Sequence, residues 1–181
     1  IGLDLVLWMM DNYEVDWVCG SMYQKLGRQL FPAEQGQYNS YGERTPWNPD
    51  TFETEDSAFG FIRMKNGASI YLRASWAINS VVKPGMVMLC GDRGGLDTYD
   101  QDLVRLNHVI AGEPAITMVG SKPNPMFSFD VNRMPREEAE LWIATLRGES
   151  DTCATAEQAC VVAEILEAIV RSNETGEVIH F

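Results

Sequence analysis

The sequence predicts an α+β domain in which helices pack on one face of a mostly antiparallel open sheet. Two observations support this fold class. Short alternating segments separated by turn residues fill much of residues 14–119, and two amphipathic helical segments follow near the C-terminus. Strands followed by helices, rather than alternating with them, favour an antiparallel sheet covered on one side. The 181 residues, 45% of them hydrophobic, suffice for one core, so we expect a single domain over residues 1–181.

The chain opens with an apolar run over residues 3–10, LDLVLWMM, which ends at Asp11-Asn12 and predicts a short buried helix. Asp4 interrupts the run. An acid inside an apolar turn needs a hydrogen-bonding partner or lines a cavity, so Asp4 is either a structural carboxylate or a substrate contact. The run begins without capping residues, and we therefore expect a further segment to precede it in the native protein.

A strand is expected over residues 14–25, followed by a long loop over residues 27–53 with no sustained period. Loops of this length are usually functional or disordered. This one is too aromatic for simple disorder, so we expect it to pack and to carry substrate or interface specificity through residues 28–52. Its aromatic residues include Phe31, Tyr38, Tyr41 and Trp47.

The clearest element is a hairpin from Glu55 to Asn79, with Asn66-Gly67 as a two-residue loop of type I′, which requires positive φ at both positions. Pairing Lys65 with Ala68 then defines a core face and a mixed face that meets solvent or another subunit. The core face contains Phe59, Phe61, Ile70, Leu72, Ala74 and Trp76, and the mixed face contains Ala58, Gly60, Ile62, Tyr71, Arg73 and Ser75.

Further short strands are expected at residues 85–90, 95–99, 103–109 and 114–119, separated by Gly-rich or Gly-Glu-Pro turns. Two helices close the chain. The first runs from Pro135 to Arg147, and the second begins at Thr155 with Gln158 as its capping-box partner. Each carries an apolar stripe that should cover a sheet. The stripes are Ala139, Trp142, Ile143 and Leu146, and then Ala159, Val162, Ile165, Leu166 and Ile169.

Charge and cysteine content limit the partners and the location. The net charge of -12 disfavours nucleic acid and anionic membranes as partners. The sequence contains no run of about 18 apolar residues, so we expect no membrane span. Four scattered cysteines with only two histidines argue against structural zinc and fit a reducing cytoplasm.

Motifs of catalysis and of cofactor binding are not found. Gly91, Gly94 and Gly95 stand in GDRGGLD, which lacks the spacing of a phosphate-binding turn and predicts a turn between strands. No serine stands in a GxSxG elbow, and His108 and His180 have no neighbours that would orient a base. We assign no catalytic, cofactor-binding or metal-binding residue, and we expect this chain alone not to bind a dinucleotide.

One aromatic pattern suggests a sugar contact. Trp76 stands at the end of a core strand and is followed by Asn79, so its ring is a candidate to stack on a sugar ring, with the Asn79 amide nearby in the chain. A tryptophan in such a pattern is more often a core residue. Arg73 lies on the opposite face of the predicted hairpin. A dimer or surface contact suits it better than a clamp on substrate.

Four segments taken together resemble the C-terminal domain of Gfo/Idh/MocA oxidoreductases. They are the opening IGLDLVLW, the hairpin ETEDSAFGFIRMKNGASIYLRASWAIN, the turn GDRGGLD and the closing ATAEQACVVAEILEAIVRSNETGE. The resemblance implies a two-domain enzyme. An N-terminal Rossmann domain, absent from this chain, would bind NAD or NADP, and the present domain would supply substrate contacts and a sheet through which subunits form a homo-oligomer.

The family pattern at the opening helix is an aspartate, Ile-Gly, a histidine, and a second aspartate three residues after the histidine. Here Ile1-Gly2 run straight into Leu3-Asp4, so Asp4 matches the second aspartate and the histidine is missing. The first aspartate would precede Ile1, and the family's catalytic lysine belongs to the absent half. The resemblance therefore implies an inactive chain whose parent protein oxidises a secondary alcohol of a sugar or polyol, or catalyses the reverse reduction.

The substrate-binding candidates are Asp4, Arg73, Trp76 and Asn79. A second hypothesis is a stand-alone module that dimerises or holds a sugar without chemistry. An upstream reading frame for a Rossmann half favours the enzyme, and a start codon just before Ile1 favours the module. A sugar-acid or phosphosugar enzyme of unrelated fold is disfavoured by the acidic charge and the absence of a basic cluster.

Overall fold

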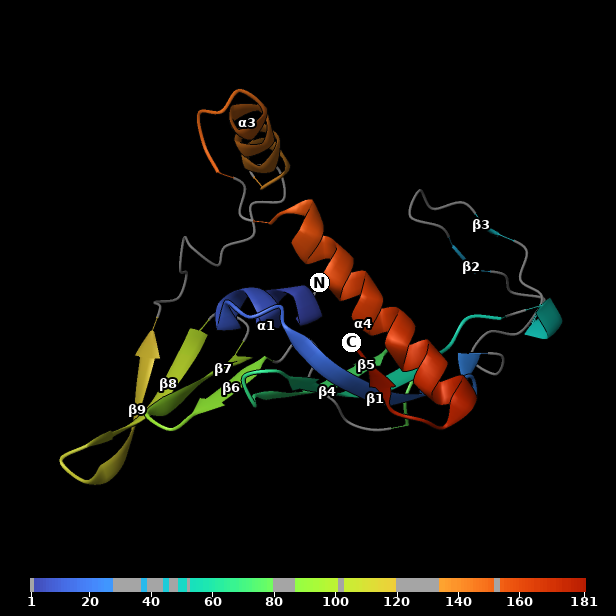
Figure 1. Cartoon of the computed structure of the whole chain (residues 1–181), viewed down its shortest axis with the longest axis horizontal. Coiled ribbons are helices and arrows are strands. Elements are labelled where there is room, and N and C mark those ends of the chain that lie inside the picture. Colours follow the sequence, from blue (N-terminus) through green and yellow to red (C-terminus); the bar gives the residue numbers. More distant parts are fainter. Residues whose placement is uncertain are drawn as a thin grey trace. The chain divides into compact units, whose positions relative to one another are not determined.

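The computed structural model describes residues 2–27, 37–38, 44–45, 49–51, 53–79, 87–100, 103–119, 134–151 and 154–181 (Figure 1). The chain divides into two compact units. The first unit comprises Ile1–Met10 and Val81–Ala159, and the second comprises Asp11–Ser80 and Cys160–Phe181. The predicted α+β class with antiparallel sheets is confirmed. None of the helices in the described ranges is long and apolar enough to cross a membrane.

The second unit is built on a four-stranded antiparallel sheet in the order β10-β1-β4-β5. Helix α4 (Ala156–Thr175) runs along one face of this sheet (Figure 1). β1 confirms the strand expected over residues 14–25. The strands are β1 (Val15–Tyr23), β4 (Ser57–Met64), β5 (Ser69–Ser75) and β10 (Ile179–His180).

Two glycines allow α4 to approach this sheet closely. Gly20 of β1 pairs with Gly60 of β4, and Ile169 of α4 lies over both. A Cβ atom at Gly20 or Gly60 would come within 2.8 or 2.7 Å of the Ile169 side chain, closer than real side chains pack. The core formed around this contact contains Val18, Ile62, Met64, Ile70, Ile165, Ala168 and Ile169.

The N-terminus of α4 has the predicted capping box. The Thr155 N–H donates to Gln158 Oε1 at 2.9 Å, and the Gln158 N–H donates to Thr155 Oγ1 at 3.2 Å. Of the predicted stripe, Ile165 and Ile169 are buried as expected, but Leu166 is exposed, so its assignment to the core is wrong. Burial instead follows the i, i+3, i+4, i+7 positions that start at Ile165 and place Leu166 to one side.

The turn of the β4–β5 hairpin differs from the prediction. Met64 N–H donates to the Ala68 carbonyl and Gly67 N–H donates to the Met64 carbonyl, both at 2.9 Å, which makes a three-residue loop over residues 65–67. Only Gly67 has a positive φ, at 90°. This is a turn that ends in a left-handed residue, so the predicted type I′ loop and the pairing of Lys65 with Ala68 are wrong.

The longer loop shifts the register by one residue and reverses the faces of β4. Ile62 pairs with Ile70, so the side chains of Ala58, Gly60 and Ile62 share the core face with Ile70, Leu72 and Ala74. Phe59 and Phe61, predicted to be core residues, lie on the opposite face with Tyr71, Arg73 and Ser75. Trp76 was also predicted on the core face, yet half of it is exposed.

The first unit contains helix α1 (Gly2–Met10) and a four-stranded antiparallel sheet in the order β6-β7-β8-β9. All four expected strands are present, but they form a separate sheet, so the prediction of one sheet is wrong. GDRGGLD turns between β6 and β7, as predicted. The strands are β6 (Met88–Gly91), β7 (Gly94–Asp100), β8 (Leu103–Ile110) and β9 (Glu113–Val119).

Helix α3 (Met134–Leu146) confirms the predicted first C-terminal helix. Its apolar stripe is not covered as expected, because Trp142, Ile143 and Leu146 are all exposed. Of the long aromatic loop, the structure describes a ribbon of β2 (Gln37–Tyr38) with β3 (Arg44–Thr45) and a 3-10 helix η1 (Pro49–Thr51). Phe31, Tyr41 and Trp47 lie outside the described residues.

Candidate substrate-binding site

Trp76 directly follows β5, and both of its N–H groups are held by the chain just before β4. The indole Nε1–H donates to the Glu55 carbonyl at 2.9 Å, and the backbone N–H donates to the Asp56 carbonyl at 3.1 Å. The side chain nevertheless remains 50% exposed. A fixed aromatic ring with an open face can stack against the apolar C–H face of a sugar ring.

Asp56 is a buried acid beside this tryptophan. Its Oδ2 accepts the backbone N–H groups of Lys25 at 2.5 Å, Leu26 at 2.6 Å and Gly27 at 3.1 Å. The residue is only 2% exposed. Three N–H donors around one carboxylate oxygen form charge-assisted hydrogen bonds, which fix the chain that leaves β1 to the start of β4.

The hydrogen bonds decide the charge state of Asp56. Burial of the carboxyl raises its pKa, but the hydrogen bonds from the N–H groups of residues 25–27 and from the Ser57 hydroxyl outweigh burial and hold the pKa below its usual range. The carboxylate is therefore ionised at neutral pH despite its burial.

Asp56 is a site residue that the sequence patterns do not predict. The available indication was its place, an acid directly before an apolar strand, which is a position where carboxylates commonly bind backbone N–H groups of a neighbouring turn. The donors, at residues 25–27, are far away in the sequence. No local pattern connects them to Asp56.

Arg73 and Asn79 lie near Trp76 in the chain but have different surroundings. Arg73 is exposed, pairs with Phe59, and belongs to the sheet face opposite α4. Asn79 is exposed in the bend after Trp76. Trp76 and Asn79 thus remain candidate sugar contacts, whereas Arg73 lies on the sheet face that carries the exposed aromatic residues.

Asp4 lies in α1, in the first unit, whereas the other three candidates lie in the second. It is half-buried, between the buried Leu3 and the exposed Leu5. Trp8, one helical turn later, is exposed, so an acid and an aromatic ring stand at i and i+4 on this helix. Trp8 is not among the candidates from sequence, because the apolar run predicts a helix that is buried throughout.

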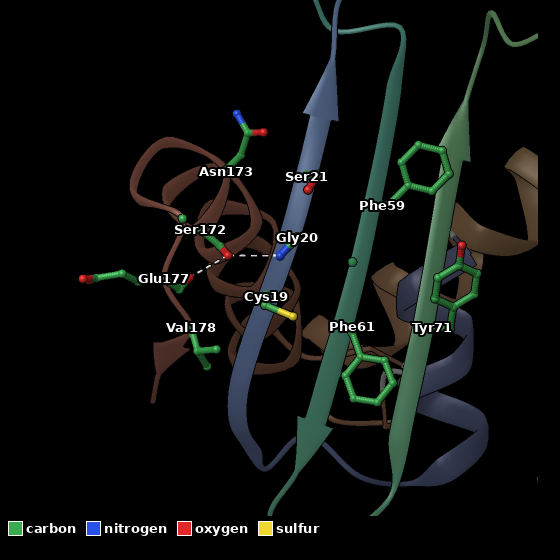
Figure 2. A pocket seen from close by; sticks show the side chains of 12 residues that line it. Cys19, Gly20, Ser21, Phe59, Phe61, Tyr71, Ser172, Asn173, Glu177 and Val178 are labelled. Carbon is green, nitrogen blue, oxygen red and sulfur yellow. Dashed lines mark hydrogen bonds between the residues drawn. The ribbon is translucent and has the colours of Figure 1, made fainter.

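A separate open groove of about 420 Å³ lies in the second unit (Figure 2). Phe59, Phe61 and Tyr71 lie on one side of β1, and the end of α4 lies on the other (Figure 2). The Ser172 hydroxyl accepts the Gly20 N–H at 3.1 Å and donates to the Glu177 carbonyl at 2.7 Å. None of the four candidate substrate contacts lines this groove.

The described residues include neither a glycine-rich phosphate-binding turn nor a cluster of metal ligands. Gly91 and Gly94 pair across a strand-to-strand turn, and in the described ranges no glycine-rich turn leads from a strand into a helix. Within the same ranges, no three histidine, cysteine, aspartate or glutamate side chains gather as a metal would require. His108 Nε2 lies 2.7 Å from Thr117 Oγ1, an ordinary polar contact between strands.

Comparison with protein families gives a match over residues 2–181 to the C-terminal alpha/beta domain of the Gfo/Idh/MocA oxidoreductase family. Among curated proteins, the chain is similar to a D-glucoside 3-dehydrogenase of Escherichia coli (strain K12). The two are 29% identical over 175 residues, which cover 96% of this chain and 44% of the relative.

Solved structures share the fold. An aldose-aldose oxidoreductase from Caulobacter crescentus, complexed with glycerol, matches with a TM-score of 0.60 and 14% identity over 99% of this chain and 45% of its own. A super-repressor mutant of Gal80p from Saccharomyces cerevisiae matches with a TM-score of 0.64 and 13% identity over 98% of this chain and 47% of its own. The chain thus spans about half the length of the relatives it matches.

Proposed function

Because the chain belongs to the Gfo/Idh/MocA oxidoreductase family, whose C-terminal domain it matches over residues 2–181, we propose that it is the substrate-binding and subunit-associating half of an NAD(P)-dependent sugar or polyol dehydrogenase. The fixed, half-exposed Trp76 carries the proposal for sugar binding. The similarity to a D-glucoside 3-dehydrogenase supports a secondary hydroxyl of a sugar as the reacting group.

Within the proposed enzyme, this chain orients the substrate and leaves the redox chemistry to the other half. NAD or NADP, when bound by a Rossmann domain, accepts or donates the hydride. Trp76 stacks on the sugar ring and the Asn79 amide binds a hydroxyl group, whereas Asp4, in the first unit, remains a separate candidate for a hydroxyl contact. Oxidation also requires a base for the hydroxyl proton, and we assign none in this chain, so we expect it to bind without turnover.

We also propose that two copies associate through the sheet face opposite α4, the aromatic face formed by Trp17, Tyr23, Phe59, Phe61 and Tyr71. Phe61 and Tyr71 are 40% and 68% exposed. Ring pairs brace this surface, because the centroids of Trp17 and Phe61 are 5.6 Å apart and those of Tyr23 and Phe59 are 6.0 Å apart. Contiguous exposed aromatic area of this kind is typical of a protein interface.

The part of β1 that β10 does not cover favours association through the sheet face rather than by addition of a strand to β1. β10 pairs only with Trp17 and Val18, and beyond them the Gly20 N–H is bound by Ser172 and the Met22 N–H by Asn173 Oδ1 at 2.9 Å. Side chains of α4 thus occupy the hydrogen-bond donors that an added strand would need.

Sugar binding by the chain is tested with saturation-transfer NMR, using methyl β-D-glucoside as the probe. We expect transfer to the ring protons of the glucoside with the unmodified chain, and its loss with Trp76→Ala. The matched control is Trp142→Ala, which removes another exposed tryptophan and should leave the transfer unchanged. Equal transfer to the glucoside with both variants would contradict the role of Trp76.

A non-catalytic module for dimerisation or carbohydrate binding is the alternative function. The fold is shared with Gal80p, a repressor by its name, so this fold is compatible with a role other than catalysis. The two functions differ upstream of the Ile1 codon. A reading frame for a dinucleotide-binding domain supports the dehydrogenase, and a start codon at that point supports the module.

For location, we propose the cytoplasm. The cysteines Cys19, Cys90 and Cys160 are free thiols, as is usual in a reducing compartment. The proposal is tested by fractionating cells and following the protein with an antibody.

A further inference from the structure

The buried pair Asp56-Ser57 stands between two parts of the second unit. On one side, the Asp56 carboxylate holds the N–H groups of residues 25–27, where the chain leaves β1. On the other side, the backbone carbonyl of Asp56 and the side chain of Ser57 contact residues 75–77. Both residues are buried, which limits the competition of water for these hydrogen bonds.

The contacts to residues 75–77 bracket Trp76. The Ser57 hydroxyl donates to the Ala77 carbonyl at 3.2 Å, and the Ser75 hydroxyl donates to the Asp56 carbonyl at 3.0 Å. The two hydroxyl oxygens are themselves 3.0 Å apart. Together with the bond from the Trp76 N–H to the Asp56 carbonyl, these contacts fix the backbone before, at and after the tryptophan.

The position of the ring follows from this arrangement. The indole Nε1–H is tied to Glu55, the residue before the pair, so the ring is oriented by the same short segment that fixes its backbone. The side chain is thereby held without being buried, since half of it remains exposed. A side chain that is fixed before it meets its ligand loses less conformational entropy on binding.

We propose that Asp56 and Ser57 are positioning residues for substrate recognition, which fix Trp76 in the orientation that contacts the sugar ring. The inference rests on the proposed role of Trp76 in sugar binding. Asp56 does not touch the substrate. It anchors the segment 55–57 through the N–H groups of residues 25–27, and Ser57 transmits this anchoring to the backbone around Trp76.

The test uses the 181-residue chain labelled with ¹⁵N, in which Trp76→Phe identifies the indole N–H resonance of Trp76. Ser57→Ala removes the Ser57 hydroxyl, and with it the links to Ala77 and Ser75 and its hydrogen bond to the Asp56 carboxylate. Asp56→Asn instead weakens the hold on the N–H groups of residues 25–27. Ser69→Ala, at the other end of β5, is the matched control. The position of the Trp76 resonance is measured without sugar, and the affinity for methyl β-D-glucoside is measured separately.

We expect Ser57→Ala to shift the Trp76 indole resonance and to weaken glucoside binding about five- to tenfold, with the amides of residues 25–27 still protected from hydrogen exchange. Asp56→Asn should change both the resonance and that protection. An unchanged indole resonance in Ser57→Ala would overturn the inference, as would a shifted resonance with unchanged affinity. Wild-type glucoside affinity in Trp76→Phe and Trp76→Ala would instead contradict the proposed sugar contact itself.

Discussion

The side chain of Ile169 fills the space over Gly60, where an added Cβ atom would come within 2.7 Å of Ile169 Cδ1. Gly60 pairs with Gly20 on the neighbouring strand, so the sheet has no side chains at these two positions. Their absence determines how closely α4 approaches the sheet. It also sets where the end of α4 lies, and therefore the hydrogen bond from the Gly20 N–H to Ser172.

Gly60→Ala should lower the free energy of unfolding by about 1–3 kcal/mol, because the new methyl group overpacks against Ile169. Ile169→Val removes Cδ1, the atom nearest to the new methyl group, and should recover part of the loss in Gly60→Ala. It should recover less in Gly20→Ala, whose methyl group also meets the Phe59 carbonyl oxygen at 2.7 Å. Urea unfolding gives the free energy of unfolding of Gly60→Ala and of Gly20→Ala, each alone and combined with Ile169→Val.

The control for this series is Gly2→Ala. No atom lies within 4 Å of a Cβ added at Gly2, and alanine is the better helix former, so stability should stay equal or rise slightly. Equal free energies of unfolding for Gly60→Ala and Gly2→Ala would contradict the close packing of α4 on the glycine pair.

Asp56 should make stability depend on pH at the acidic end. Its pKa is lowered in the folded chain, so its contribution is fully present above the unfolded pKa of about 4 and is lost as pH falls through the lower folded value. The difference in free energy of unfolding between wild type and Asp56→Asn should therefore be constant from pH 7 to pH 5 and should shrink below about pH 4. Urea titrations at several pH values measure it. A difference that grew on acidification would contradict the ionised, hydrogen-bonded carboxylate.

Arg105 should contribute more to the free energy of unfolding than an arginine in an exposed ion pair does. In the first unit its Nε donates to the buried Asp97 Oδ1 at 2.8 Å, and Asn107 donates to Oδ2 at 3.1 Å. Arg105→Leu removes a charge-assisted hydrogen bond to this buried carboxylate and should lower the free energy of unfolding by about 2 kcal/mol. The matched control is Arg136→Leu, which breaks the exposed pair with Glu140 and should cost at most about 0.5 kcal/mol. Similar losses in the two variants would contradict the burial of Asp97.

Association through the aromatic face is tested with a charge at its exposed centre. Tyr71→Glu places a carboxylate among apolar rings, so we expect light scattering to show a dimer for the wild-type chain and a monomer for this variant. Leu166→Glu puts the same charge on the exposed side of α4 and should leave the dimer intact. A dimer that survives Tyr71→Glu and dissociates in Leu166→Glu would place the interface on the helical side.

Much of the fold could be predicted from local patterns. The hairpin, the strands at 88–119, both C-terminal helices and the Thr155 capping box follow from spacing and turn residues. The faces of β4 could not be predicted, because they depend on whether the loop around Gly67 has two or three residues, and either is compatible with Asn-Gly. The separation into two sheets depends on long-range pairing that no local pattern encodes.

Less of the candidate site than of the fold could be predicted from the sequence. Trp76 was identified from its place at a strand end, but its exposure depends on the hairpin register and on the carbonyl of Glu55. Asp56 was overlooked because its partners lie about thirty residues away, as the bond from Leu26, with a separation of 30, illustrates. Burial and hydrogen bonding of an acid become evident only when both segments are in place.

Sugar binding by Trp76 is tested by an NMR titration of the ¹⁵N-labelled chain with methyl β-D-glucoside, which follows the Trp76 indole N–H, and NADH is titrated in parallel. We expect the glucoside to shift the Trp76 resonance and NADH to shift no resonance at the same concentration. A Trp76 resonance unmoved by the glucoside, together with tight binding of NADH, would contradict the assignment of this chain as the substrate-binding half.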